Sequence, residues 1–318
     1  MEQCGTLLTA DLALTADGPA GRPPRLNHYT PLRYPGGKGK LAGYVKRMLK
    51  ANRLTDGEYV EPYAGGAAIG LELLFHEYVS RIHINDVSRP VYAFWKAVLD
   101  HTDEFCRLIA DTPRTVEAWD RQKKVLMAQT DHDDLMLGFA TFFLNRTNRS
   151  GILNGGIIGG RDQTGPWKID ARFNVPELMR RITAIAKMKR RISLTRQDAL
   201  AFLQGGVSRW PSKTLIYLDP PYYVKGSQLY HDYYRHADHE CIANFVRSGI
   251  KSQKWIVSYD NVPAVQDLYQ GVRSIIYDIH YSARSPRKGA EIMFFCEGLR
   301  VPALGGAMNP VEEDRLIA

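Results

Sequence analysis

The chain has 318 residues, of which 44% are hydrophobic and 24% are charged, as in an ordinary soluble globular protein. Its net charge of +8 and pI of about 9.2 favour a polyanionic partner. No apolar run approaches the roughly 20 residues of a membrane span, and the acidic side chains of Glu2 and Asp11 interrupt any signal-peptide pattern. Four scattered cysteines without a Cys-x-x-Cys pair argue against a zinc site or a disulfide framework and suit a reducing cytosol, so we expect a cytoplasmic protein.

The first part of the chain predicts alternating strands and helices. Residues 1–26 end in a Gly/Pro-rich stretch and are expected to form a flexible leader. The pattern then predicts a helix over 41–50, a strand over 58–61, a helix over 67–78, a strand over 82–84 and a helix over 91–99. This alternation is typical of a doubly wound parallel sheet.

The pattern changes between residues 100 and 189. Helices are expected over 103–111, 115–128, 133–144 and 176–189, with a glycine-rich stretch at 150–160 and a strand-like run at 167–169. Strands over 192–195, 215–218, 255–258, 273–281 and 290–296 then resume, with helices over 238–252 and 263–270. We therefore expect one discontinuous α/β domain (27–99 and 190–300), a mostly helical insertion (100–189) and a C-terminal tail (301–318).

The tetrapeptide Asp219-Pro220-Pro221-Tyr222 is the strongest chemical signal in the chain. It follows the apolar strand 215–218, and ligands of open α/β sheets bind beyond the carboxyl ends of strands. The Asp219 carboxylate and the Pro220 carbonyl could accept the two N–H donors of an adenine amine, and Tyr222 could stack on an extruded base. A surface turn of the Asp-Pro type is the structural alternative.

Three further segments have the residue types of a cofactor site. Glu61-Pro-Tyr63-Ala-Gly65-Gly66 joins a strand to a helix, where a ligand can approach the backbone closely. Asp86 follows the next strand, about 20 positions after the glycine turn, and is placed to accept from ribose hydroxyls. Tyr34-Pro-Gly-Gly37-Lys38 offers an aromatic face, an open backbone and a cation.

Together these motifs resemble the Dam-like DNA adenine-N6 methyltransferases with the alpha order of motifs, over about residues 33–297. The resemblance implies a Rossmann-like S-adenosylmethionine-dependent methyltransferase sheet and S-adenosylmethionine as cofactor. It implies cofactor contacts from Tyr34, Lys38, Asp86 and Asp219, and it places Gln197-Asp198 near the cofactor adenine. Ala67 stands where the family usually has glycine, so we expect a slight adjustment of the pocket for the methionine part of the cofactor.

The insertion takes the place of the family's target recognition domain. By resemblance, Asn145 and Arg146 open onto double-stranded DNA, and Asn148 and Arg149 extend that segment; arginine can read guanine and asparagine can read adenine. Eight basic residues between 172 and 196 form a candidate phosphate-binding face, for which a solvated helix face is the alternative. The basic residues of the loop between the last two strands are expected to touch the DNA backbone; they are Arg284, Arg287 and Lys288.

The sequence thus predicts a site-specific enzyme that methylates the N6 amine of a flipped adenine and uses no metal. The stretch 231–240 has the residue types of a metal site, but it also resembles the family's loop that closes over the target base. The alternatives are an RNA adenine or cytosine-N4 methyltransferase and an inactive DNA-binding regulator. Nucleoid association would follow from the DNA substrate, a symmetric target would suit a homodimer, and a cognate restriction endonuclease would fit a restriction-modification role.

Overall fold

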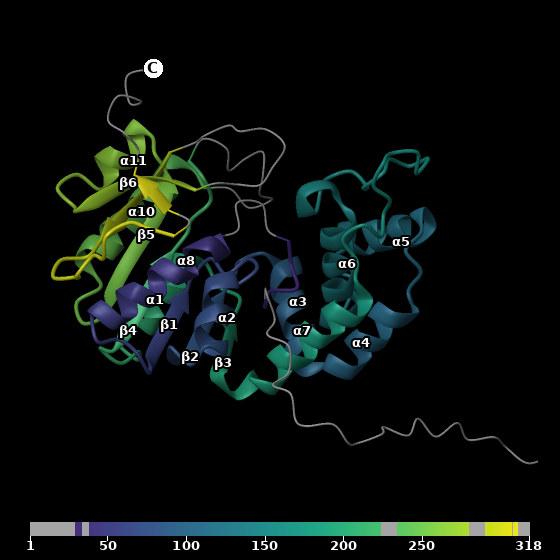
Figure 1. The fold of residues 1–318 in the computed structure, drawn as a ribbon, viewed down its shortest axis with the longest axis horizontal. Coiled ribbons are helices and arrows are strands. Elements are labelled where there is room, and N and C mark those ends of the chain that lie inside the picture. Colours follow the sequence, from purple (N-terminus) through teal and green to yellow (C-terminus); the bar gives the residue numbers. More distant parts are fainter. Residues whose placement is uncertain (1–28, 34–37, 224–233, 280–289, 307, 311–318) are drawn as a thin grey trace, which may run out of the picture.

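The computed structural model describes residues 29–33, 38–223, 234–279, 290–306 and 308–310, which build an eight-stranded sheet in the order β3-β2-β1-β4-β5-β7-β6-β8 (Figure 1). The strands are β1 (Gly57–Glu61), β2 (Val79–Asn85), β3 (Ile192–Thr195), β4 (Thr214–Leu218), β5 (Lys254–Asp260), β6 (Ser274–Ile279), β7 (Glu291–Phe295) and β8 (Met308–Pro310). The pairings from β3 to β5 are parallel, and β7 lies antiparallel between β5 and β6. The predicted Rossmann-like α/β fold is confirmed.

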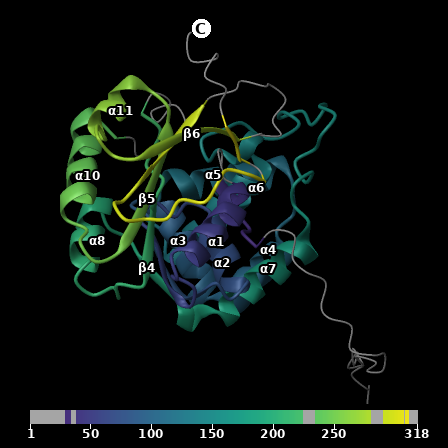
Figure 2. The ribbon, with the colours of Figure 1, turned by 60° about the vertical axis from the view of Figure 1, so that its left-hand side comes forward.

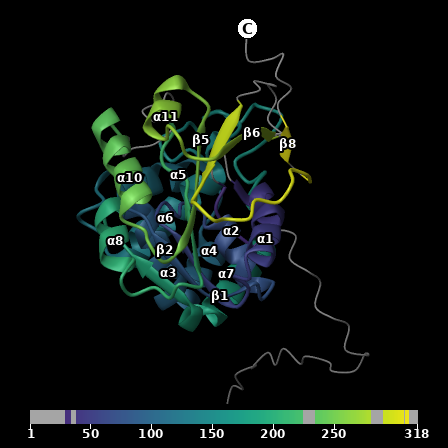
Figure 3. The ribbon, with the colours of Figure 1, turned by 90° about the vertical axis from the view of Figure 1, so that its left-hand side faces the viewer.

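Helices cover both faces of this sheet. Helices α8 (Ala199–Gly206) and α10 (His236–Ser248) lie on one side of β4 and β5, and α1 (Ala42–Ala51) and α2 (Ala68–Phe75) lie on the other (Figures 2 and 3). The remaining elements around the sheet are η1 (Lys38–Leu41), α3 (Arg89–Asp100), η3 (Lys189–Arg191) and α11 (Pro263–Leu268). With helices on both faces, β4 is buried along its whole length, which explains its apolar sequence.

The insertion is a group of helices beside the sheet (Figure 1): α4 (Thr102–Asp111), α5 (Val116–Met127), α6 (Asp134–Thr147), η2 (Arg149–Gly151) and α7 (Val175–Lys187). Thr115, Asp133 and Asn174 cap α5, α6 and α7, because each side chain accepts a backbone N–H from the first turn of its helix. Among the described residues, no helix is long and apolar enough to cross a membrane.

The insertion and the sheet domain share one hydrophobic core. Phe94 of α3 stacks on Phe142 of α6, with ring centroids 6.1 Å apart and planes 8° apart. Gly138 lets α6 approach α3 closely, since a Cβ there would lie 2.5 Å from the carbonyl oxygen of Ala93. The buried aromatic side chains Phe105, Phe139, Phe143 and Phe173 continue this cluster.

Three local features differ from the sequence-based expectation. Residues 167–169, expected as strand-like, lie in bends and turns, because no neighbouring strand pairs with them in the described part of the chain. Helix α8 was not predicted, and its N-cap is Asp198, whose side chain accepts from Leu200 N and Ala201 N. Strand β8 comes from the segment expected to be a tail, and it pairs antiparallel with β6.

Candidate active site

The predicted motif residues gather at the carboxyl ends of three parallel strands. Glu61 ends β1, Asp86 follows β2, and Asp219 follows β4. These strands are neighbours in the sheet, so their carboxyl ends meet at one edge. This is the edge where open α/β sheets bind ligands.

Hydrogen bonds hold the Asp219 carboxylate in place. Ser258 of β5 donates its hydroxyl to Asp219 Oδ1 at 2.8 Å, and Tyr217 lies 2.8 Å from the same Ser258 oxygen. A serine hydroxyl has one proton to donate, so Tyr217 must donate to Ser258. Lys38 Nζ lies 3.6 Å from Oδ1. Asp219 Oδ2 has no partner among the described residues and is available to a ligand.

The protonation of Asp219 is set mainly by its burial. Burial raises the pKa of the carboxyl to about 6, Lys38 opposes the rise and Glu291 adds to it. The side chain nevertheless keeps 28% of its surface exposed. Asp219 is therefore mostly ionised at neutral pH and reachable from solvent, as an acceptor of amine protons must be.

Glu291, at the start of β7, is the central acceptor of the site and was not predicted. Its Oε2 accepts from Lys38 Nζ at 2.7 Å and from the Tyr277 hydroxyl at 3.0 Å, and its Oε1 accepts from the Tyr222 hydroxyl at 3.1 Å. Lys38 Nζ also lies 5.1 Å from the centre of the Tyr222 ring. Lys38 is thereby brought together with Asp219 and Tyr222 of the tetrapeptide, which is far from it in sequence.

The glycine turn after β1 is held by its neighbours. Gly65 donates its N–H to Asp86 Oδ2 at 2.9 Å, and the buried Trp95 indole of α3 donates to the Gly65 carbonyl at 2.9 Å. Gly65 and Ala67 have φ values of +44°. Left-handed backbone favours glycine, so the family's usual glycine at position 67 has a conformational reason. The turn leads directly into the N-terminus of α2.

Glu61 lies beneath this turn and is nearly inaccessible. Its Oε1 accepts from the Tyr59 hydroxyl at 3.0 Å and from Gly70 N at 3.2 Å, whereas its buried Oε2 has no partner among the described residues. Burial raises the pKa of Glu61 to about 8, against the opposing hydrogen bonds from Tyr59 and Gly70. A cationic group reaching Oε2 would find an unused acceptor, so this side chain fits the ammonium end of an amino acid.

The ends of β1, β2 and β3 are joined by Asn85, a second residue that was not predicted. Its fully buried amide donates to the carbonyls of Pro62 and Gln197, at 3.0 and 2.9 Å, and its Oδ1 accepts from Thr195 Oγ1 and Gln197 N. The side chains of Gln197 and Asp198 are exposed beside this junction. Tyr63 is partly buried, and its hydroxyl donates to the Tyr234 hydroxyl at 3.1 Å.

The predicted DNA-contacting residues at the end of α6 and directly after it differ in exposure. Asn145 and Asn148 are buried, and their amides are used inside the protein: Asn145 bonds to the Arg33 backbone and Gly151 O, and Asn148 bonds to Trp119, Ile152 and Leu153. Arg146 donates to the Arg172 carbonyl, and Arg149 is exposed. In this structure the two asparagines hold the loop after α6, and Arg149 reaches solvent.

Five predicted site residues lie outside the described residues: Tyr34, Gly37, Arg284, Arg287 and Lys288. Of the eight basic residues between 172 and 196, four make ion pairs: Arg180 and Arg181 with Glu177, Lys189 with Asp100, and Arg191 with Glu77. Much of the expected phosphate-binding face is thus neutralised within the protein. Over the described ranges, no group of three or more His, Cys, Asp or Glu side chains could hold a metal ion.

One family model matches part of the chain. The family model of the D12 class N6 adenine-specific DNA methyltransferases matches residues 34–153, which include the glycine turn, Asp86 and most of the insertion. The resemblance expected from the motifs is confirmed over this part of the chain, and the match supports a methyltransferase. It implies S-adenosylmethionine as the methyl donor. No curated protein sequence matches the chain.

Several solved structures are similar to the chain at low identity. A putative methyltransferase, yhhF, from Escherichia coli is 10% identical, with 84% of this chain and 89% of that chain covered and a TM-score of 0.34. The rRNA methyltransferase aviRa from Streptomyces viridochromogenes is 10% identical, with coverages of 82% and 85% and a TM-score of 0.35. A putative class I S-adenosylmethionine-dependent methyltransferase from Listeria monocytogenes is 10% identical, with coverages of 83% and 62% and a TM-score of 0.35.

Proposed function

We propose that this protein transfers a methyl group from S-adenosylmethionine to the N6 amine of an adenine flipped out of double-stranded DNA. The observation that carries the proposal is the Asp219 carboxylate. One of its oxygens is fixed by Ser258, the other is open to a ligand, and the Pro220 carbonyl and the Tyr222 ring follow directly. An N6 amine has two N–H donors, which this carboxylate and carbonyl can accept together.

The two acceptors align the amine for attack. With both N–H groups bound, the nitrogen lone pair is drawn out of conjugation with the ring and toward the methyl donor. A carboxyl with a pKa near 6 is ionised at neutral pH and basic enough to take up the proton that leaves N6 when the N–C bond forms. Glu291 fixes the Tyr222 hydroxyl, so the ring that would stack on the base has a defined orientation.

The residues around the glycine turn fit the cofactor. Glu61 Oε2 would accept from the ammonium group of the cofactor's methionine part. The glycine turn would let the cofactor approach the protein backbone closely, and Asp86 would accept from the ribose hydroxyls of the cofactor. Gln197 and Asp198 are proposed to lie beside its adenine. When bound, the cofactor supplies a methyl group on a sulfonium whose leaving group is a neutral thioether. Most of the protein's contribution is then the positioning of the amine.

The test is a methyl-transfer assay with purified protein, radiolabelled S-adenosylmethionine and duplex DNA, followed by digestion to nucleosides. We expect N6-methyl-2′-deoxyadenosine in the digest. Asp219→Ala should abolish transfer while the duplex affinity stays within about twofold, because the carboxylate acts on the extruded base. Wild-type turnover in Asp219→Ala would contradict the role of this residue.

The same digest separates the other substrates. Labelled N4-methylcytosine in the digest would overturn adenine as the target base. Label that enters only an RNA substrate of the same sequence would overturn DNA as the substrate. In either case the protein would still be a methyltransferase. Glu297→Gln is a matched control, since this glutamate is exposed just beyond β7. If calorimetry showed no binding of S-adenosylmethionine, the enzymatic proposal would fail and a DNA-binding regulator would remain.

A further inference from the structure

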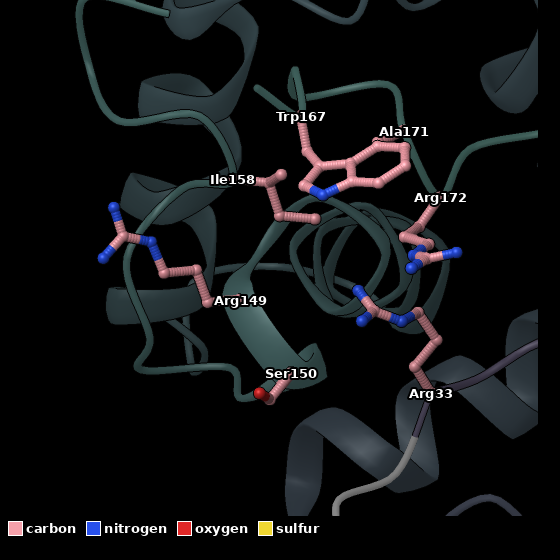
Figure 4. Close-up of a pocket in the computed structure, with 7 residues that line it drawn as sticks. All are labelled: Arg33, Arg149, Ser150, Ile158, Trp167, Ala171 and Arg172. Atoms are coloured by element: carbon pink, nitrogen blue, oxygen red, sulfur yellow. The ribbon is translucent and has the colours of Figure 1, made fainter. Parts of the chain in front are cut away.

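A pocket of about 370 Å³ lies where the segment before η1 meets the insertion, and none of the residues described around Asp219 lines it (Figure 4). Its lining residues come from the segment before η1 and from the loop between α6 and α7; they are Arg33, Arg149, Ser150, Ile158, Trp167, Ala171 and Arg172. The guanidinium groups of Arg33 and Arg172 approach each other inside it, and Arg149 lies across from them (Figure 4). The pocket is thus basic, and two parts of the chain build it.

No ion pair neutralises these three arginines within the described part of the chain. This contrasts with Arg180, Arg181 and Arg191 nearby in the sequence, which all pair with glutamates. Like charges gathered without a counterion repel one another, and an anion would relieve that repulsion.

The electrostatics of the neighbouring Arg146 agree with this picture. Burial lowers the pKa of the Arg146 guanidinium to about 9, and the charges of Arg33, Arg181 and Arg172 add to the decrease. Burial, and to a smaller extent the charge of Arg172, likewise lowers the pKa of the Arg33 guanidinium. Both groups stay charged at neutral pH, so the cluster holds a surplus of positive charge when no anion is bound.

The opposite wall of the pocket is apolar and exposed. Trp167 keeps 61% of its surface accessible, while the other four tryptophans are at most 9% exposed. Its ring lies beside Ile158 (Figure 4), and the Arg172 guanidinium stands 5.8 Å from the ring centre. An aromatic ring and an aliphatic side chain facing a cluster of cations suit a ligand that is anionic on one side and apolar on the other.

We propose that this pocket is a clamp for the DNA backbone, in which Arg33, Arg172 and Ser150 hold a phosphodiester and Trp167 packs on the adjoining deoxyribose. The inference rests on the proposed function, since it supplies a second, sequence-independent contact to the same duplex. Phosphate contacts fix the register of a protein on DNA without reading bases. Arg149 then extends from the rim toward the flanking duplex.

The salt dependence of duplex binding tests the proposed contact between the pocket arginines and the phosphodiester. We expect Arg172→Gln to weaken binding about tenfold or more at about 0.1 M salt and to reduce the slope of log Kobs against log salt by about 0.9, equally for unrelated duplex sequences. Arg107→Gln is the matched control, because Arg107 is an exposed arginine of α4 with 70% of its side chain accessible. An unchanged slope in Arg172→Gln would overturn the clamp.

Tryptophan fluorescence tests the proposed packing of Trp167 on the deoxyribose. Since Trp167 is the exposed tryptophan, it should dominate acrylamide quenching of the protein, and Trp167→Phe should remove most of that quenching. Saturating duplex DNA should protect the wild type. Protection by inorganic phosphate or single-stranded RNA at concentrations where the duplex gives none would refute a DNA clamp. Loss of protection in Arg172→Gln, with protection kept in Arg107→Gln, would support it.

These readouts do not depend on catalysis. A protein that shows the slope change and the DNA protection but methylates nothing would retain the clamp and lose the proposed function. A protein that methylates adenine normally, with an unchanged slope in Arg172→Gln and an unprotected Trp167, would retain the function and lose the clamp.

Discussion

Replacing Glu291 by glutamine should change both the stability of the protein and the pH dependence of its activity. Glu291 accepts from the buried Lys38 ammonium at 2.7 Å, and both side chains are about 5% exposed. Removing one partner of a buried ion pair costs about 3–5 kcal/mol. Asp219 Oδ1 remains 3.6 Å from Lys38 and glutamine keeps one oxygen, so we expect about 1.5–3 kcal/mol.

The thermal consequence follows from the size of the protein. An unfolding entropy of about 2.1 cal/mol/K per residue over 318 residues gives about 0.7 kcal/mol/K, so the melting temperature should fall by about 2–5 °C. Differential scanning calorimetry measures this decrease. Glu297→Gln should leave the melting temperature unchanged within about 1 °C, because the Glu297 side chain is exposed.

The effect on activity has a definite sign. In the wild type, kcat/KM should fall as the pH drops through about 6, because Asp219 gains a proton and its carboxylate can no longer accept an N–H of the amine or take up its proton. Glu291 raises the pKa of Asp219, so its neutralisation should move this acidic limb to lower pH, by about half a unit or more. Stronger pairing of Lys38 with Asp219 acts in the same direction. An acidic limb that stays in place or moves upward in Glu291→Gln would refute this account of the electrostatics.

Three further variants test other parts of the site. Because Glu61 has a pKa of about 8, an ammonium group that pairs with its carboxylate must displace a proton, so the affinity for S-adenosylmethionine should rise between about pH 6.5 and 8.5. Isothermal titration calorimetry measures this affinity and should show no such rise in Glu61→Gln. Ala67→Gly should raise the free energy of unfolding by about 1 kcal/mol in urea titrations, since position 67 has a φ of +44°, and a destabilised variant would contradict that reason. Asn145→Ala removes three hydrogen bonds of a buried amide, so it should lower the free energy of unfolding by about 2–4 kcal/mol and weaken duplex binding. A free energy of unfolding that changes by less than about 0.5 kcal/mol would refute the positioning role of Asn145.

The sequence predicted the sheet well because its strands carry strong local signals. Residues 215–218 are apolar throughout, and the structure buries them completely in β4. Helix α8 is not apparent from the sequence pattern, because it is short; its start is marked by the capping residue Asp198, for which the resemblance implies only a place near the cofactor adenine. Strand β8 has no apolar period of its own and exists through its pairing with β6.

The site was predicted in part, and the missing residues share a property. Lys38, Asp86 and Asp219 stand in motifs with recognisable neighbours, and the structure brings Lys38 and Asp219 within 3.6 Å. Glu291 and Ser258 lie inside strands and contact the motif residues only through the fold. A carboxylate at the head of the apolar run of β7 is a signal that could have been used, because a charge in a buried strand needs a partner.

The contact between α3 and α6 limits how this protein could be re-engineered. Phe94 and Phe142 stack across it, and Gly138 sits against the Ala93 backbone, so an exchange of the whole insertion at residues 100 and 189 would cut through a packed interior. The chain from the end of α6 to the start of α7 carries two of the pocket arginines, Arg149 and Arg172, and the exposed Trp167. Phe173 near its end packs on Phe142 and Phe143, so this residue must be kept with the helices. Chimaeras meant to alter target choice should therefore exchange this loop alone and keep the helices as a fixed platform.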